Sequence, residues 1–282
     1  MTSRWRSIPK IDVHAHVVLH QRENTDLILN RPEQMMETMG KHNVKQAVVL
    51  PINSPKYFPL DPEQQSAWLR ANNETQSQLM AESKGQFIAF ADCSIDDEYE
   101  DADHVRAELA CAIDTLGLRG LKIHPYNLGA PATDGRLRAW YEAATELALP
   151  ITIHSNPTGY DPSFNGSAPS TIYRAFHALN EAITVAHLGG IAFLETMVGF
   201  GYVDLSYTLI MLADLYGISF CERLLRRIGI DRILFGTDIP LCTYEDYEPI
   251  FDAMALSADE LERIAFVNAE RMLTGQPPLD SE

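Results

Sequence analysis

Residues 11–17 read IDVHAHV, with polar and apolar side chains in strict alternation. Alternation at every second residue is typical of a β-strand, because successive side chains point to opposite faces. The pattern therefore predicts a strand that carries Asp12, His14 and His16 on one face. Such a face either contacts solvent or lines a functional site, and the rest of the chain must decide between the two.

Further segments rich in β-branched and apolar residues follow this one, with helical spacing between most of them. The eight predicted strands cover residues 10–19, 46–52, 85–93, 118–125, 149–155, 182–189, 201–207 and 232–240. The clearest predicted helices cover residues 32–42, 62–84, 137–148 and 219–229, and a small one is expected at 191–198.

The spacing of these strands predicts the fold. Most strand starts lie roughly 30–40 residues apart, which is the size of a βα unit. Eight such units in succession predict an α/β protein with a closed (β/α)8 TIM barrel, formed by residues 1–282 as a single domain. An open doubly wound sheet is the alternative. It would normally place a glycine-rich turn after the first strand, where the chain instead reads VVLHQREN (17–24).

The charge of the chain limits its partners. Acidic residues number 39 against 22 lysines and arginines, which gives a formal net charge of −17. Such a surface repels the phosphates of nucleic acids and of anionic lipids. We therefore expect a small-molecule substrate, no nucleic acid and no membrane partner, and the sequence leaves a homo-oligomer open.

The cysteines and the first residues bear on the compartment. Cys93, Cys111, Cys221 and Cys242 are widely spaced and form no C-x-x-C pair, as expected for reduced thiols. The opening MTSRWRSIPK (1–10) lacks the apolar core of a signal peptide. These features predict a cytoplasmic protein.

Polar residues gather where the predicted strands end, and barrel enzymes form their active sites at the carboxyl ends of strands. Five of the nine histidines lie at such positions. The residues concerned are His14, His16, Lys122, His124, His154, His187 and Asp238. A single buried histidine is usually structural, but this convergence favours a shared site.

Imidazole and carboxylate groups are typical ligands of Zn²⁺, Mn²⁺ and Fe²⁺. The two-residue spacing of His14 and His16 on one strand lets both reach a shared ion. His154 would add a third nitrogen and Asp238 a carboxylate, which leaves a coordination position for water or substrate. An open position of this kind distinguishes a catalytic metal site from a structural one.

Four motifs resemble the amidohydrolase superfamily: the D-x-H-x-H of IDVHAHV, ITIHSNP (151–157), VAHLGG (185–190) and FGTDIP (235–240). More narrowly, they resemble the amidohydrolase-related branch, which includes aminocarboxymuconate-semialdehyde decarboxylase, other aromatic-acid decarboxylases, and assorted hydrolases and lactonases. The resemblance extends from about residue 8 to residue 275. It is specific for the superfamily and weaker for any one substrate.

The resemblance implies one divalent ion, with Zn²⁺ expected first and Mn²⁺ or Fe²⁺ as alternatives, held by His14, His16, His154 and Asp238. His187 would stand beside the activated water or the substrate. Asp12 would orient an imidazole through its free ring nitrogen, or serve as a network carboxylate at the strand start.

Lys122 and His124 have two interpretations. In binuclear members of the superfamily, a lysine on the fourth strand is carbamylated and bridges two metals. Alternatively, both side chains line the pocket.

Substrate contacts are expected from loops that follow the strands, at residues 53–62, 125–136 and 156–170. These loops are rich in Pro, Gly, Asn and Ser, as active-site loops often are. The candidate binding residues are Arg31, Lys56, Tyr57, Tyr126, Asn127 and Tyr207.

Hydrolysis of a small-molecule ester, lactone or amide bond is the first expectation for function. Asp238 would then be the general base and His187 would stabilise the polarised oxygen or move a proton. The alternative is a metal-dependent, non-oxidative decarboxylase of an aromatic or unsaturated carboxylic acid. A barrel that has lost catalysis and only binds a ligand is a third hypothesis, against which the complete ligand set argues.

Overall fold

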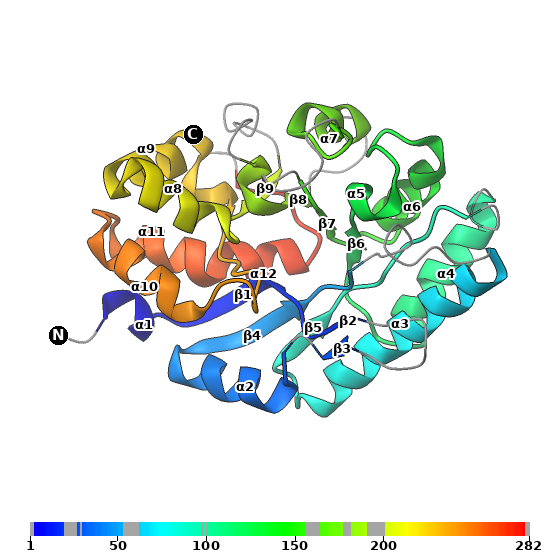
Figure 1. Cartoon of the computed structure of the whole chain (residues 1–282), viewed down its shortest axis with the longest axis horizontal. Helices are drawn as coiled ribbons and strands as arrows, with labels where there is room; N and C mark the ends of the chain where they lie inside the picture. Colours follow the sequence, from blue (N-terminus) through cyan, green and yellow to red (C-terminus); the bar gives the residue numbers. More distant parts are fainter. Residues whose placement is uncertain are drawn as a thin grey trace.

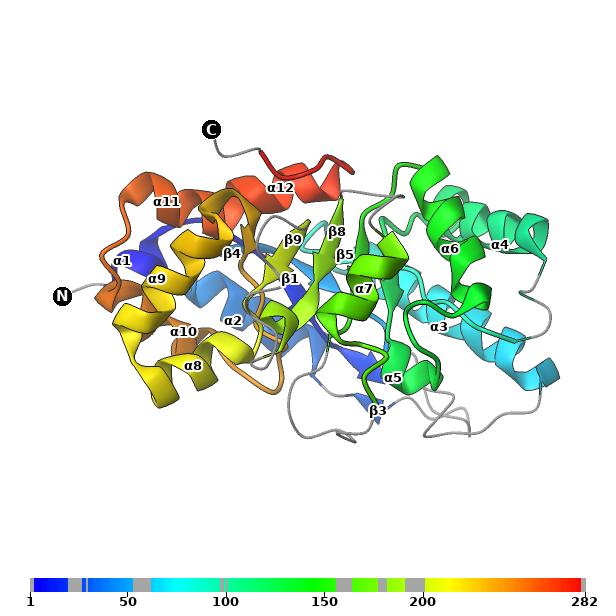
Figure 2. The same ribbon diagram turned by 90° about the horizontal axis from the view of Figure 1, so that it is seen from above.

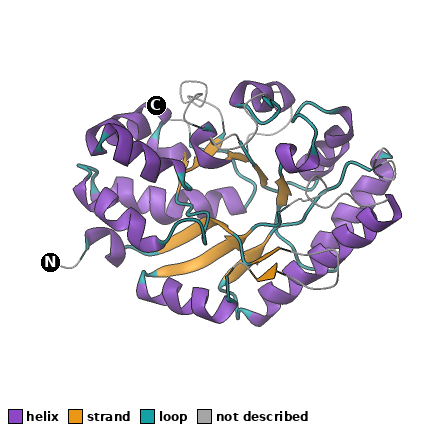
Figure 3. Cartoon of the chain, in the orientation of Figure 1, coloured by secondary structure: helices purple, strands orange, loops and turns teal. Residues whose placement is uncertain are grey.

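The computed structural model describes residues 3–19, 27–28, 30–52, 62–96, 99, 101–155, 164–176, 182–190 and 201–279. Parallel strands occupy its centre and helices surround them (Figures 1 and 3). Turned by 90°, the molecule shows α8 to α11 on one side of the strands and α3, α4 and α6 on the other (Figure 2). The predicted α/β fold is confirmed.

In the part of the chain that the structure describes, eight strands form the barrel, and each lies within or overlaps one of the eight predicted segments. They are β1 (Lys10–Ala15), β4 (Val44–Val49), β5 (Phe87–Ala89), β6 (Leu121–Ile123), β7 (Ile151–Ile153), β8 (Ile183–Val185), β9 (Tyr202–Asp204) and β10 (Ile233–Leu234). A short antiparallel pair, β2 (Val18–Leu19) and β3 (Leu27–Ile28), follows β1. Most barrel strands are shorter than predicted.

Two parallel sheets, in the orders β1-β4-β5 and β10-β9-β8-β7-β6, are joined at both edges. One joint is a bridge between Ala91 and Leu121, and the other a bridge between Ala15 and Ile239. At the second joint Val13 N donates to Phe235 O at 2.9 Å, and Asp238 N donates to His14 O at 2.8 Å. The sheet is therefore closed, and the first and last strands meet beside the predicted metal ligands.

The helices of the outer layer follow the strands in sequence. They are α1 (Arg4–Ser7), α2 (Pro32–Lys41), α3 (Pro62–Glu82), α4 (Ala102–Asp114), α5 (Pro125–Leu128), α6 (Gly135–Glu146), α7 (Pro169–Phe176), α8 (Thr208–Tyr216), α9 (Ile218–Ile228), α10 (Tyr244–Ala253), α11 (Ala258–Glu262) and α12 (Asn268–Leu273). The helices predicted at 32–42, 62–84, 137–148 and 219–229 correspond to α2, α3, α6 and α9. The small helix expected at 191–198 lies outside the described residues.

The strands separate two apolar cores. The outer core lies between strands and helices and includes Ala47, Val49, Leu121 and Ile123, whereas a smaller core inside the barrel includes Val48. The alternate positions of each strand therefore point inward, as the period of a β-strand requires. A side chain at the carboxyl end of an inward-facing row reaches the barrel mouth.

A bulge in β1 changes which residues share a face. Asp12 pairs with Ala47 and Ala15 pairs with Val49, so three steps along β1 match two along β4. Ala47 and Val49 belong to the outer core, while Val13 lies in the inner one. The prediction that Asp12 shares a face with His14 and His16 is therefore wrong, because the extra residue reverses the alternation.

Asp92 follows β5 and is fully buried, and it supplies a testable pH dependence. It accepts hydrogen bonds from Asn72 Nδ2 at 2.5 Å and from Cys93 N at 2.8 Å. Burial outweighs these bonds and raises the pKa of Asp92 from 3.8 to about 7. The folded state then keeps a proton that the unfolded chain loses near pH 4. The stability that this proton supplies is present below the unfolded pKa and is lost as the pH rises through about 7.

We expect Asp92→Asn to flatten the pH dependence of stability between about pH 4 and 7. At about 1.4 kcal/mol per pKa unit, the slope it removes corresponds to a few kcal/mol. A flip of the Asn72 amide restores the hydrogen bond. Urea unfolding at pH 5 and pH 7.5 measures the effect, with the exposed Asp114→Asn as control. An unchanged slope in Asp92→Asn would show that Asp92 is ionised in the folded protein.

Candidate metal centre and active site

Three predicted ligands meet where β1 and β10 join. The Nε2 atoms of His14 and His16 lie 3.6 and 3.2 Å from Asp238 Oδ1. One ligand atom from each of these residues falls within 4.8 Å of the others, a spacing that a metal ion can bridge. His14 lies on β1, His16 directly follows β1, and Asp238 lies in the segment after β10, so the closure of the barrel brings the three together.

The other ring nitrogen of each histidine fixes its orientation. His16 Nδ1 donates to Leu50 O at 2.9 Å, and His14 Nδ1 donates to Asp204 Oδ2 at 2.9 Å. A carbonyl and a carboxylate only accept, so both imidazoles carry their proton on Nδ1. The Nε2 lone pairs therefore face the Asp238 carboxylate. Lone pairs that face a carboxylate repel it unless a cation lies between them, so these residues fit a divalent metal.

Asp204, at the end of β9, was not predicted from the sequence. Besides His14 Nδ1, it accepts hydrogen bonds from His187 N at 2.9 Å and from Ser206 N at 3.1 Å, and a short one from Ser206 Oγ. A carboxylate that holds a ligand imidazole is common in metal sites. In the sequence, Asp204 has the same feature as the predicted site residues, a polar side chain at the carboxyl end of a strand.

His187 and His154 form a chain of hydrogen bonds beside this group. Ser206 Oγ, which donates to Asp204, lies 2.9 Å from His187 Nδ1 and accepts its proton. His187 Nε2 is then an acceptor for His154 Nδ1 at 3.1 Å. This order leaves the lone pair of His154 on Nε2. Among the described residues, His154 belongs to neither tight group of possible ligands, which are His14–His16–Asp238 and His14–His187–Asp204.

The backbone at the mouth adopts conformations that side chains rarely take. His187 has φ 59° and ψ 35°, and Asp238 has φ 63°. The left-handed region disfavours residues with a Cβ, and such strain is common at functional sites. Gly236 leaves room for His14 beside this segment, because a Cβ at position 236 would lie only 3.1 Å from His14 Cβ.

Burial and neighbouring charges set the protonation states. Burial and the nearby Lys122 ammonium together lower the pKa of His14 to about 4, against the opposing effect of Asp204. Burial alone would raise the pKa of Asp238, but the imidazoles of His14 and His16 outweigh it and hold it well below its usual value. At neutral pH the site therefore offers a neutral imidazole and an ionised carboxylate, the forms that bind metals.

Asp12 holds two segments of the backbone together through hydrogen bonds. It accepts hydrogen bonds from Thr237 Oγ1 at 2.6 Å, from Thr237 N at 3.1 Å and from His14 N at 3.0 Å. These bonds connect β1 to the segment that carries Asp238. Among the described contacts, none of its hydrogen-bond partners is an imidazole ring, so these contacts fit the network carboxylate that the sequence allowed.

The pocket candidates on β6 lie next to the histidines. Lys122 is 1% exposed, and the ring of His124 stacks on that of His154 with centroids 3.7 Å apart. His124 Nδ1 accepts from Asn127 N at 3.3 Å, which starts the short helix α5. Tyr126 packs edge-on against Phe164, with centroids 5.4 Å apart.

The remaining candidates differ in position. Tyr207, with φ 59°, precedes α8, and its N–H donates to Tyr247 Oη at 2.8 Å. Arg31 is exposed at the start of α2. Lys56 and Tyr57 lie outside the described residues, as do most of the loops at 53–62 and 156–170.

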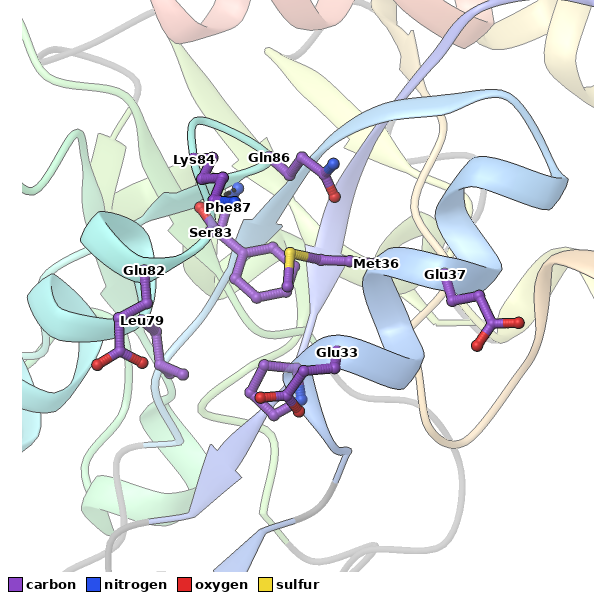
Figure 4. Close-up of a pocket in the computed structure, with 10 residues that line it drawn as sticks. Glu33, Met36, Glu37, Leu79, Glu82, Ser83, Lys84, Gln86 and Phe87 are labelled. Carbon is purple, nitrogen blue, oxygen red and sulfur yellow. Dashed lines mark hydrogen bonds between the residues drawn. The ribbon is translucent and has the colours of Figure 1, made fainter.

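A separate pocket lies between α2 and α3, outside the barrel. Met36, Leu79 and Phe87 line it, with Glu33, Glu37 and Glu82 around them (Figure 4). It contains none of the candidate site residues.

A closed barrel with a cluster of histidines and carboxylates at its mouth is the architecture of barrel enzymes that bind a metal ion. A family model described as Amidohydrolase matches residues 11–274. The chain therefore belongs to the amidohydrolase family, and the resemblance of its motifs is confirmed.

Solved structures with the same fold are known. The chain is similar to 2,6-dihydroxybenzoate decarboxylase from Rhizobium, with TM-score 0.70, 15% identity, and coverage of 94% of this chain and 98% of that one. It is similar to 5-carboxyvanillate decarboxylase from Novosphingobium aromaticivorans, complexed with manganese and 4-hydroxy-3-methoxy-5-nitrobenzoic acid (0.70, 15%, 95% and 96%). A third is 4-oxalomesaconate hydratase from Rhodopseudomonas palustris (0.67, 17%, 94% and 96%).

No curated protein matches the chain significantly. Within the described residues, no helix combines the length and apolar character needed to cross a membrane.

Proposed function

We propose that this chain is a metal-dependent, non-oxidative decarboxylase of an aromatic or unsaturated carboxylic acid. The observation that carries the proposal is the set of imidazole lone pairs, fixed by hydrogen bonds on Nδ1, that face the Asp238 carboxylate inside a buried barrel mouth. The decarboxylases among similar structures favour this reaction over hydrolysis, which was the first expectation from the sequence.

His14, His16 and Asp238 would hold the ion, and His154 would be the fourth ligand through Nε2, the nitrogen on which the hydrogen-bond order leaves its lone pair. When bound, a divalent ion supplies a positive charge that fixes the substrate carboxylate and stabilises negative charge. Zn²⁺ is the ion first expected from the ligands, and the manganese bound to a similar decarboxylase makes Mn²⁺ the second.

The reaction breaks the bond between the carboxylate group and the ring or alkene carbon that carries it. The carboxylate leaves as CO2, and a proton takes its place on that carbon. Asp238 rests as a carboxylate, so it can accept a proton from the substrate or water and return it to the carbon. Val48, Leu50 and Phe90 belong to the apolar core inside the barrel and would help to exclude water from the reacting carboxylate. His187 keeps His154 in position through the bond between Nε2 and Nδ1.

The direct test is CO2 release from a panel of hydroxybenzoates and unsaturated acids, with protein loaded with Zn²⁺ or Mn²⁺. Hydrolysis of lactones and esters is measured on the same preparations. We expect CO2 release that requires the metal. Hydrolysis without any CO2 release would contradict the proposal and support the hydrolase expected from the sequence.

Metal binding gives a prediction that needs no substrate. We expect close to one divalent ion per chain in protein from metal-replete medium, and a sharp loss of occupancy in His14→Ala, because His14 belongs to both tight groups of ligands. His154→Ala should also lower occupancy. Elemental analysis measures both, with His104→Ala on α4 as the matched control. Two ions per chain, with a carbamate on Lys122, would support the binuclear alternative.

A further inference from the structure

Three polar side chains form a row inside the barrel below the histidines. Lys122 on β6 pairs in register with Thr152 on β7, which pairs with Thr184 on β8. Their chain neighbours, such as Leu121 and Ile123, belong to the outer core. The three side chains therefore point inward, two residues before the positions of His124 and His154.

All three are buried, at 1%, 1% and 0% exposure. Among the described residues, Lys122 Nζ, Thr152 Oγ1 and Thr184 Oγ1 have no hydrogen-bond partner. Buried polar atoms normally have partners, and an unpaired buried cation is costly. Three such atoms at one level of adjacent strands indicate a place for a ligand.

The carboxylates nearest to the row are already engaged. Asp204 accepts from His14, His187 and Ser206, and Asp238 faces the imidazoles of His14 and His16. Both attract the Lys122 ammonium electrostatically, but neither forms an ion pair with it among the described contacts. The ammonium therefore keeps its donors available for another anion.

The rest of the described interior is mainly apolar. Ile11, Val13, Val48, Leu50 and Phe90, on β1 and at β4 and β5, belong to the inner core, which continues through Tyr202 and Leu234. The interior thus offers a cation and two hydroxyl donors on one side and an apolar wall on the other. This combination suits a flat hydrocarbon ring that carries an oxyanion.

We propose that Lys122, Thr152 and Thr184 form an anion subsite that binds a second ionised group of the substrate, so that the preferred substrate is a dianionic aromatic acid. One carboxylate occupies the metal centre and the second group takes the hydrogen bonds of the row. The proposal rests on the proposed function for the first carboxylate, but the second can be tested without turnover. A charge-assisted hydrogen bond contributes enough for a preference of roughly ten- to a hundredfold.

The test compares the binding of benzoate and of isophthalate, benzene-1,3-dicarboxylate, by calorimetry on metal-loaded protein. We expect isophthalate to bind at least about tenfold more tightly in the wild type. Lys122→Met should bring the two affinities close together, and Lys122→Arg should retain part of the preference. Thr152→Val and Thr184→Val should each reduce it. Lys45→Met, which removes an exposed lysine from β4, should leave it unchanged.

Lys122→Met is expected to fold, because it replaces a buried unpaired charge with an apolar chain of similar length. If it does not fold, the threonine variants decide. Equal binding of the two probes by the wild type would overturn the proposal, and so would an unchanged preference in the variants. A carbamate on Lys122, detected by intact mass, would overturn it as well. The two proposals can fail separately. If the protein prefers isophthalate through Lys122 but releases no CO2, the result supports the anion subsite and contradicts only the proposed decarboxylase activity.

Discussion

Asp238→Asn is expected to fold, to retain much of its metal and to lose at least about a hundredfold in turnover. Asparagine keeps the size of the side chain and one oxygen that can bind the metal. It cannot accept and return a proton, which is the role proposed for Asp238. Its backbone φ of 63° is also one that asparagine tolerates better than most residues.

Metal content and turnover should be measured on the same preparations. Asp214→Asn, an exposed change on α8, is the matched control and should leave both unchanged. If Asp238→Asn keeps its metal and turns over at a near-normal rate, Asp238 is only a ligand. If the metal is lost together with activity, the experiment points to ligation rather than proton transfer.

Asp204→Asn is expected to weaken metal binding by about ten- to a hundredfold, although Asp204 is not a proposed ligand. The carboxylate holds the proton of His14 on Nδ1 and so keeps Nε2 available. An asparagine that turned its amide nitrogen toward His14 would favour the other tautomer. The variant should also be less stable, because a buried donor left without its acceptor costs about 1–3 kcal/mol.

Competition with a chelator measures the metal affinity, and urea unfolding of the metal-free protein measures the stability. Both are needed, since a loss of stability alone would mean that Asp204 only supports the loop at Ser206. Wild-type metal affinity in a folded Asp204→Asn protein would contradict the orienting role.

The order and number of barrel strands could be predicted, because the buried strands of a parallel barrel are continuous apolar segments. Their lengths could not. Residues such as Phe90 and Leu118 extend these segments, yet they pack as irregular chain on either side of short strands. Residues beyond the last hydrogen bond of a strand are buried as well. The apolar pattern in the sequence therefore extends past the ends of the strand.

The site was predictable where a residue type that binds metals lies at the carboxyl end of a predicted strand, as at His14, His16 and Asp238. It was not predictable at Asp12, because the bulge in β1 adds a residue without leaving any mark on the alternation. At Asp204 the position at the carboxyl end of a strand was visible in the sequence, but its role was not, because the imidazole that the carboxylate holds is distant in the chain. Its partner His14 is 190 residues away and becomes a neighbour only when the barrel closes.

The left-handed residues at the mouth place a limit on how stable this protein can be. His187, Tyr207 and Asp238 each hold a torsion that glycine would accept without cost, yet a glycine there would remove the side chain that the site needs. These torsions therefore carry an energetic penalty, which the binding of any ligand that stabilises the folded state would offset. Selection for thermal resistance alone would favour glycine at these positions, at the cost of their side chains.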